Sequence, residues 1–195
     1  MVVSALVGGL LLGVLTNLAQ GWLPGAWNQI ANSGAVWSVA AFAAGAVAAR
    51  RVGPSVAAVV GLCAEAGLVV GYYGYAEVAR DGMGSLFAPL VWVGAAFVAG
   101  PLFGVAGVWW RGENARRRVV ALAALAGVFG MEGLHYALVL QYAPQAWACL
   151  GVLLLVVLAM GRGLRERALT LLASVVFSLL AHLVVDKLIL SALLG

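Results

Sequence analysis

Five residues inside long apolar runs have side chains that can perform acid–base or metal chemistry. They are three carboxylates and two histidines: Glu65, Glu132, Asp186, His135 and His182. An ionisable group at the centre of a helix in hydrocarbon costs about 2.5–3.5 kcal/mol on insertion scales, so such a group usually faces the interior of a bundle and has a function. The other acidic residues lie between apolar runs or at their ends, and we expect them to be solvated: Glu77, Asp81, Glu113 and Glu166.

Acid catalysis on an apolar substrate is the chemistry that these residues favour. Hydrocarbon disfavours a charged carboxylate, so a buried carboxyl group can keep its proton at neutral pH and donate it. Aromatic faces near the acid stabilise a developing carbocation. The predicted catalytic residues are Glu65, Glu132, His182 and Asp186, with Asp186 or Glu65 as the proton donor and His182 placed to orient Asp186. The predicted substrate-binding residues are Tyr72, Tyr73, Tyr136, His135, Trp37, Asn17 and Asn32.

Metal binding is the main alternative for the later acids and histidines. Glu132-x-x-His135 and His182-x-x-x-Asp186 each place two ligand types on one helix face, and bundle metal sites use Glu-x-x-His on facing helices. Seven-helix hydrolases related to adiponectin receptors have two histidines four residues apart in their last helix, whereas Asp186 replaces the second here. We therefore predict no metal and no other cofactor. Lys187 lies too near the outer end of its run for a retinal Schiff base.

The elements that carry these residues are predicted to be transmembrane helices. The chain of 195 residues is 65% hydrophobic and 9% charged, whereas soluble domains are about 45–50% apolar and about 25% charged. A span needs about 20 apolar residues, so we predict an all-α polytopic bundle of seven helices that forms one transmembrane domain over residues 1–195. The spans are 3–23, 34–49, 54–76, 86–110, 119–141, 145–161 and 168–192. In a six-span alternative, 145–161 is short or re-entrant.

The distribution of basic residues predicts the orientation of the spans. Nine of the eleven arginines and lysines follow the second, fourth and sixth spans. Cytoplasmic loops have such an excess, so we predict a multi-pass protein of the cell membrane with its N-terminus in the cytoplasm and its C-terminus outside. The polar residues within the spans then converge on the outer half of the bundle. Topology explains the basic residues, so we predict no nucleic-acid partner.

Size, span number and the placement of two acids resemble the integral membrane terpene cyclases of meroterpenoid pathways. The resemblance implies one acid early in the bundle and one in the last helix, at Glu65 and Asp186 in this sequence. The predicted partners are the membrane lipid bilayer and an apolar prenyl or lipid-like small molecule. Composition and the segment from Asn32 to Trp37 resemble small actinobacterial membrane proteins as well, which implies no function.

The alternative function is that of a small-solute carrier or a substrate-binding membrane subunit with an outward-facing polar pocket. The substrate-binding subunits of energy-coupling vitamin transporters have a similar length but usually six helices. A structural interpretation also exists for some polar residues. Ser174 and Ser178, four residues apart, are of the type that bonds carbonyl groups of the preceding turn or permits close helix packing.

Overall fold

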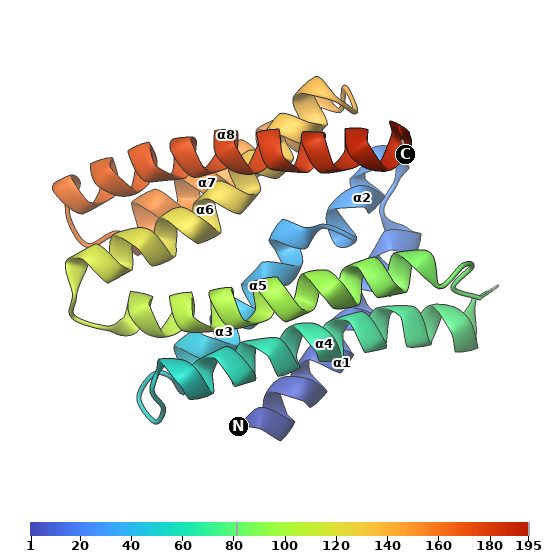
Figure 1. The fold of residues 1–195 in the computed structure, drawn as a ribbon, viewed down its shortest axis with the longest axis horizontal. Coiled ribbons are helices and arrows are strands. Elements are labelled where there is room, and N and C mark those ends of the chain that lie inside the picture. The colour runs from blue at the N-terminus through green and yellow to red at the C-terminus, as the bar shows by residue number, and fades with distance from the viewer. Residues whose placement is uncertain (81, 195) are drawn as a thin grey trace. The chain divides into compact units, whose positions relative to one another are not determined.

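The computed structural model describes residues 1–80 and 82–194, and in the last helix it describes the side chains through Val185 and that of Lys187. Every regular element in this part of the chain is helical (Figure 1). In chain order the elements are α1 (Val2–Trp22), η1 (Gly25–Trp27), α2 (Asn28–Ala31), α3 (Gly34–Ala48), α4 (Pro54–Ala79), α5 (Phe87–Arg111), α6 (Ala115–Leu138), α7 (Ala143–Met160) and α8 (Leu164–Leu194).

Seven helical segments in the described residues are long and apolar enough to cross a membrane, which confirms the all-α class and the predicted number of spans. The segment that was in question, α7, is a continuous helix of 18 residues. At 1.5 Å per residue it is about 27 Å long, close to the hydrocarbon thickness of about 30 Å. Large apolar side chains such as Leu90, Phe97 and Leu102 remain exposed, as expected for helices that face lipid.

The chain divides into two compact units, Met1–Arg117 and a second that begins at Arg118. The single domain predicted from the sequence stays a prediction. The first unit contains the elements from α1 to α5, and the second contains α7, α8 and nearly all of α6.

In the first unit, glycines let helix backbones approach closely. A Cβ atom at Gly9 would meet the backbone of Ala64, and one at Gly71 would meet the backbone of Leu10. The contacts follow the same direction along both helices, because Gly13 lies further along α1 than Gly9 and meets Leu68 and Tyr72, which lie further along α4 than Ala64. Helices α1 and α4 are therefore parallel, and small residues form the contact as in other membrane helix pairs.

Helix α5 packs on α4 through a second set of glycines. A Cβ atom at Gly61 of α4 would meet the backbones of Gly100 and Gly104 of α5, and one at Gly104 would meet Ala57. These contacts run in opposite directions along the two helices, so α4 and α5 are antiparallel. Gly104 also meets Gly45 of α3. The face of α4 that follows Gly61 at four-residue intervals is therefore held against α5.

In the second unit, α6 and α8 are joined by a hydroxyl group. The Ser178 Oγ donates to the carbonyl oxygen of Gly127 at 3.0 Å and lies 2.7 Å from that of Ser174. Ser174 Oγ in turn donates to the carbonyl oxygen of Thr170 at 2.7 Å. The structural interpretation of these serines is confirmed, because they bond preceding-turn carbonyls and fill the approach between two helices.

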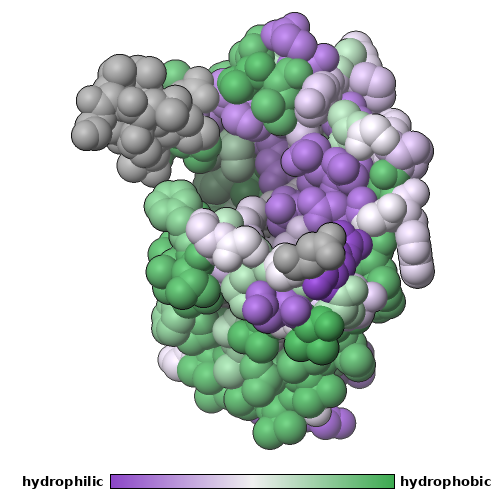
Figure 2. Space-filling model, turned by 90° about the vertical axis from the view of Figure 1, so that its right-hand side faces the viewer, coloured by the Kyte–Doolittle hydropathy of each residue, from purple (hydrophilic) through white to green (hydrophobic). Residues whose placement is uncertain are grey.

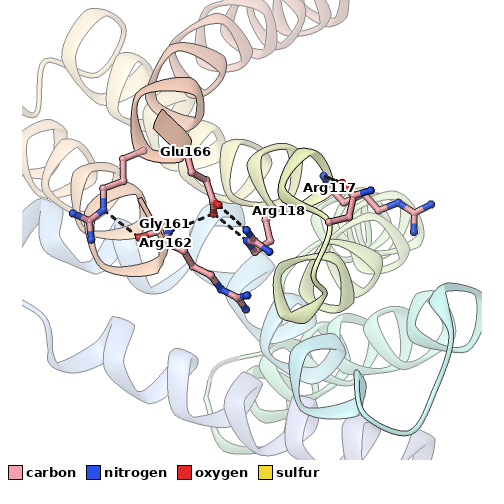
Figure 3. Close-up of polar contacts among 7 residues, drawn as sticks. Arg117, Arg118, Gly161, Arg162 and Glu166 are labelled. Atoms are coloured by element: carbon pink, nitrogen blue, oxygen red, sulfur yellow. Dashed lines mark hydrogen bonds and ion pairs between the residues drawn. The ribbon is translucent and has the colours of Figure 1, made fainter. Parts of the chain in front are cut away.

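A buried ion pair holds the first turn of α6 to the first turn of α8 (Figure 3). Arg118 Nη2 lies 2.8 Å from Glu166 Oε2, and its Nε donates to Glu166 Oε1 at 3.1 Å. The two side chains are only 7% and 10% exposed. The expectation that Glu166 is solvated was therefore wrong, since a neighbouring helix supplies a forked partner for the carboxylate. The backbone N–H of Arg162 adds a third, longer bond of 3.4 Å to Oε1.

Polar and basic residues gather at helix ends. In the first unit, Arg50, Arg51 and Arg111 lie at one end, and Arg80 lies at the opposite end, after α4. Figure 2 looks onto the side where α4 ends and α5 begins, and shows hydrophilic residues collected on this face. Helix α3 begins after a residue type that favours helix starts. Ser33 Oγ accepts a hydrogen bond of 3.2 Å from the N–H of Val36 and caps the helix.

Candidate functional site

Glu65 is the buried acid of the first unit, with 4% of its surface exposed. It follows Gly61 by four residues and precedes Val69 by four, so all three lie on one face of α4. Gly61 of α4 meets Gly100 of α5, and Val69 of α4 packs in a buried cluster with Ala96 of α5. Glu65 therefore lies on the face of α4 that packs against α5. No hydrogen bond or ion pair joins its carboxyl group to another described residue.

Four aromatic rings gather further along α4 and form what we call the aromatic cluster: Trp37, Tyr72, Tyr73 and Trp92. The Trp37 ring centroid lies 4.6 Å from that of Trp92 and 5.3 Å from that of Tyr72. Tyr72 and Tyr73 meet edge to face at 5.0 Å. Tyr72 follows Glu65 by two helical turns, or about 10 Å of rise. Three of the four rings are among the predicted substrate-binding residues.

A polar network adjoins the aromatic cluster at the end of α1. Asn17 Nδ2 donates to the carbonyl oxygen of Tyr72 at 3.0 Å, and the Tyr72 hydroxyl donates to Gln20 Oε1. Arg80 Nη2 donates to the carbonyl oxygen of Asn17 at 2.6 Å. The buried Oδ1 atoms of three asparagines have no hydrogen-bond partner among the described residues: Asn17, Asn28 and Asn32.

In the second unit, the predicted residues occupy adjoining positions on α6 and α8. Glu132 and His135 are half-buried, and Tyr136 and His182 are buried. Helices α6 and α8 are parallel, because Arg118 meets Glu166 and Gly127 meets Ser178 in the same order. His182, one turn beyond Ser178, is therefore level with Glu132.

Glu132 is also within electrostatic range of Tyr136 and of Cys149 on α7. Cys149 is buried beside Gly133, so three groups from α6 and α7 adjoin here. The side chain of Asp186 lies outside the described residues.

The sequence also predicts one cavity shared by Glu65, Glu132, His182 and Asp186, and this stays a prediction because these residues come from both units. Glu65 belongs to the first, whereas Glu132 and His182 belong to the second. Three cavities in the described part of the chain are lined by other residues. No group of three or more histidine, cysteine, aspartate or glutamate residues in the described part of the chain is arranged to hold a metal ion.

Sequence reasoning missed three residues of the first unit. Trp92 completes the aromatic cluster, Gln20 accepts the Tyr72 hydroxyl bond, and Arg80 binds the carbonyl end of α1. A tryptophan four residues before buried Ala96 was the available signal for Trp92, since both lie on one helix face. The bonds of Gln20 and Arg80 join residues more than 50 positions apart, and local patterns do not indicate such pairs.

Comparison with known proteins identifies a family for the whole chain but no activity. No curated protein and no solved structure matches the chain. One family model matches residues 1–191, which include both units except for the last four residues. The chain therefore belongs to the family described as a family of unknown function (DUF6518).

Proposed function

We propose that the chain is an intramembrane enzyme that uses a buried carboxylic acid to start cyclisation of a prenyl or lipid-like substrate. The observation that carries the proposal is Glu65, a carboxyl group that is buried without a hydrogen-bonding or ionic partner among the described residues and precedes the aromatic cluster by two turns of α4. A structural acid would be expected to have a partner, because an unpaired buried polar group destabilises a fold. A catalytic acid without a partner can remain protonated in an apolar site and give its proton to the substrate.

The proposed reaction is a proton-initiated isomerisation. The Glu65 hydroxyl group transfers its proton to a terminal carbon–carbon double bond, which leaves a tertiary carbocation on the substrate and a carboxylate on the protein. The next double bond attacks the cation and forms a ring bond. Loss of a proton from the carbon beside the final cation gives a new double bond and returns a proton to a carboxylate. Substrate and product have the same formula, so no oxidant or cofactor is consumed.

Residues of α1, α3 and α4 have parts in this proposal. The faces of Trp37, Tyr72 and Tyr73 stabilise positive charge as it moves along the folded chain. The Asn17 and Gln20 bonds fix the backbone and hydroxyl group of Tyr72. Glu132, His135, Tyr136, His182 and Asp186 of the second unit stay predicted site residues, with Asp186 as the second candidate donor.

Glu65→Gln is expected to lower turnover at least about 100-fold, because general acid catalysis contributes about 10²–10⁴-fold. The purified protein in lipid nanodiscs is incubated in D2O with geranylgeraniol and with a farnesylated phenol. A wild-type product that is one mass unit heavier than the substrate, from one deuteron added and one proton lost, reports the reaction. Glu113→Gln is the matched control, because Glu113 is exposed after α5 and should retain full turnover.

Two outcomes contradict the enzymatic proposal. Equal turnover of Glu65→Gln and the wild type would show that another group donates the proton. A wild-type protein that leaves these prenyl probes unchanged and binds a small polar solute would favour a carrier.

We propose that the N-terminus is cytoplasmic and the C-terminus external in the cell membrane. Cysteine residues placed singly at Arg51 and at the C-terminus of a cysteine-free protein are treated in intact cells with a membrane-impermeant maleimide. We expect labelling at the C-terminus only, because the basic loops remain inside. Labelling at position 51, or a C-terminus accessible only after lysis, would contradict this orientation. A cysteine at Gly82, in the opposite loop of the first unit, is the positive control.

A carrier of a polar solute is the second candidate, and one observation favours it. The unpartnered Oδ1 atoms of Asn17, Asn28 and Asn32 are acceptors that a bound solute with N–H or O–H donors would satisfy. This alternative gives saturable binding of a small polar solute, and it gives no product. Chemical identification of the molecule that copurifies with the protein separates an isoprenoid from a polar solute.

A further inference from the structure

A cavity of about 590 Å³ lies between α1, α3 and α4, at the end of the first unit opposite Arg80. Its volume is within the range of about 300–1,000 Å³ that is common for ligand sites. The walls are small apolar residues, among them Ala5, Gly8, Ala40 and Ala44. A Cβ atom built at Gly8 meets nothing within 4 Å, so this wall borders open space rather than another helix.

Two arginines follow the last turn of α3 at the mouth of this cavity. Arg50 and Arg51 both line it, both are exposed, and neither has an ion-pair partner among the described residues. Arg50 also lines a second cavity of about 370 Å³, together with Trp110 and Arg111. The Arg111 guanidinium carbon lies 5.7 Å from the centre of the Trp110 ring. The two cavities therefore share Val47 and Arg50 as lining residues, and three cations line one or both of them.

We propose that these two cavities form a binding site for an anionic phospholipid. One acyl chain lies in the apolar cavity between α1 and α3, and the headgroup phosphate binds Arg50 and Arg51, with Arg111 on its other side. Guanidinium groups match phosphate oxygens with paired hydrogen bonds. Basic pockets between transmembrane helices are typical sites for anionic headgroups. The site is independent of the proposed catalytic function, because Glu65 lines neither cavity.

Other ligand classes fit these features less well. A free anion leaves the apolar cavity unexplained, and a neutral lipid leaves the unpaired arginines unexplained. A zwitterionic phospholipid brings an ammonium group among three cations, which lowers its affinity. An anionic diacyl lipid has an acyl chain that matches the apolar walls and a phosphate that matches the arginines at the mouth.

Native mass spectrometry of the full chain in detergent tests the proposal. The protein is titrated with phosphatidylglycerol and with phosphatidylcholine of identical acyl chains. We expect phosphatidylglycerol to bind at one site at least tenfold more tightly. Replacing both mouth arginines, R50Q with R51Q, should abolish that preference, whereas R165Q, at an exposed position early in α8, should retain it. Equal affinities for the two lipids in the wild type would overturn the proposal.

Gly8→Leu tests the cavity separately from the charges. Its side chain should occupy the space of the acyl chain and weaken phosphatidylglycerol binding at least tenfold. Gly94→Leu is the control, since a Cβ atom at Gly94 also meets nothing within 4 Å but Gly94 lines none of the described cavities. Unchanged binding in Gly8→Leu would overturn the proposal. So would competition by tail-free glycerophosphoglycerol at the affinity of the lipid, which would assign the arginines to a soluble phosphate.

Discussion

Glu166→Leu is expected to lower the free energy of unfolding by about 3–5 kcal/mol, the usual effect of removing one member of a buried ion pair. The variant removes the carboxylate that binds the Arg118 guanidinium, whose side chain is only 7% exposed in the native pair. It also removes the acceptor of the Arg162 backbone N–H at the start of α8. Reversible unfolding by titration with sodium dodecyl sulfate in mixed micelles measures the change.

Two comparisons separate this effect from a general effect of altered charge. Arg165→Leu changes the neighbouring exposed residue of the same helix and should alter stability by less than about 0.5 kcal/mol. Combining Glu166→Leu with Arg118→Met should restore much of the loss, because it removes the unpaired charge as well. A loss below about 1 kcal/mol in the single variant would instead be typical of a solvent-exposed pair and would contradict its burial.

Gly9→Ala and Gly8→Ala are expected to have opposite effects although the two residues are adjacent. A methyl group at Gly9 meets the carbonyl group of Ala64, so α1 and α4 must separate, at a cost of about 1–3 kcal/mol for an overpacked contact. A methyl group at Gly8 enters open space, and alanine favours a helix by up to about 1 kcal/mol over glycine. The same unfolding titration measures both variants. Equal stability of the two variants would contradict the close parallel pairing of α1 and α4.

The sequence predicts the helices well because their signals are local. Apolar runs of sufficient length mark all seven spans, and Ser33 marks the start of α3 through a bond to a residue three positions away. The contacts between helices are not local. Gly9 is conspicuous in the sequence only as a glycine, and nothing near it indicates that Ala64 is its neighbour. Glu166 resembles a solvated end-of-helix charge until Arg118, 48 residues earlier, is placed beside it.

In the candidate site, too, local relations could be predicted from the sequence and contacts between helices could not. Glu65 and Tyr72 are two turns apart on one helix, so their common face could be predicted from spacing alone. The sequence grouped Trp37 and Tyr72 only as predicted substrate-binding residues. The distance of 5.3 Å between their ring centroids supports that grouping. Trp92 was missed because an isolated tryptophan in an apolar run is equally typical of a lipid-facing position.

The parallel pairing of α1 with α4 has a consequence for how the protein is made. Two helices joined by a short loop are normally antiparallel, so α1 cannot find this partner in the next helix that the ribosome delivers. Ala64 is synthesised about 55 residues after Gly9, which takes roughly 3–11 s at about 5–20 residues per second. During that interval the glycine face of α1 has no helix to receive it. Insertion machinery that retains α1 until α4 arrives would prevent the early helices from diffusing apart in the bilayer.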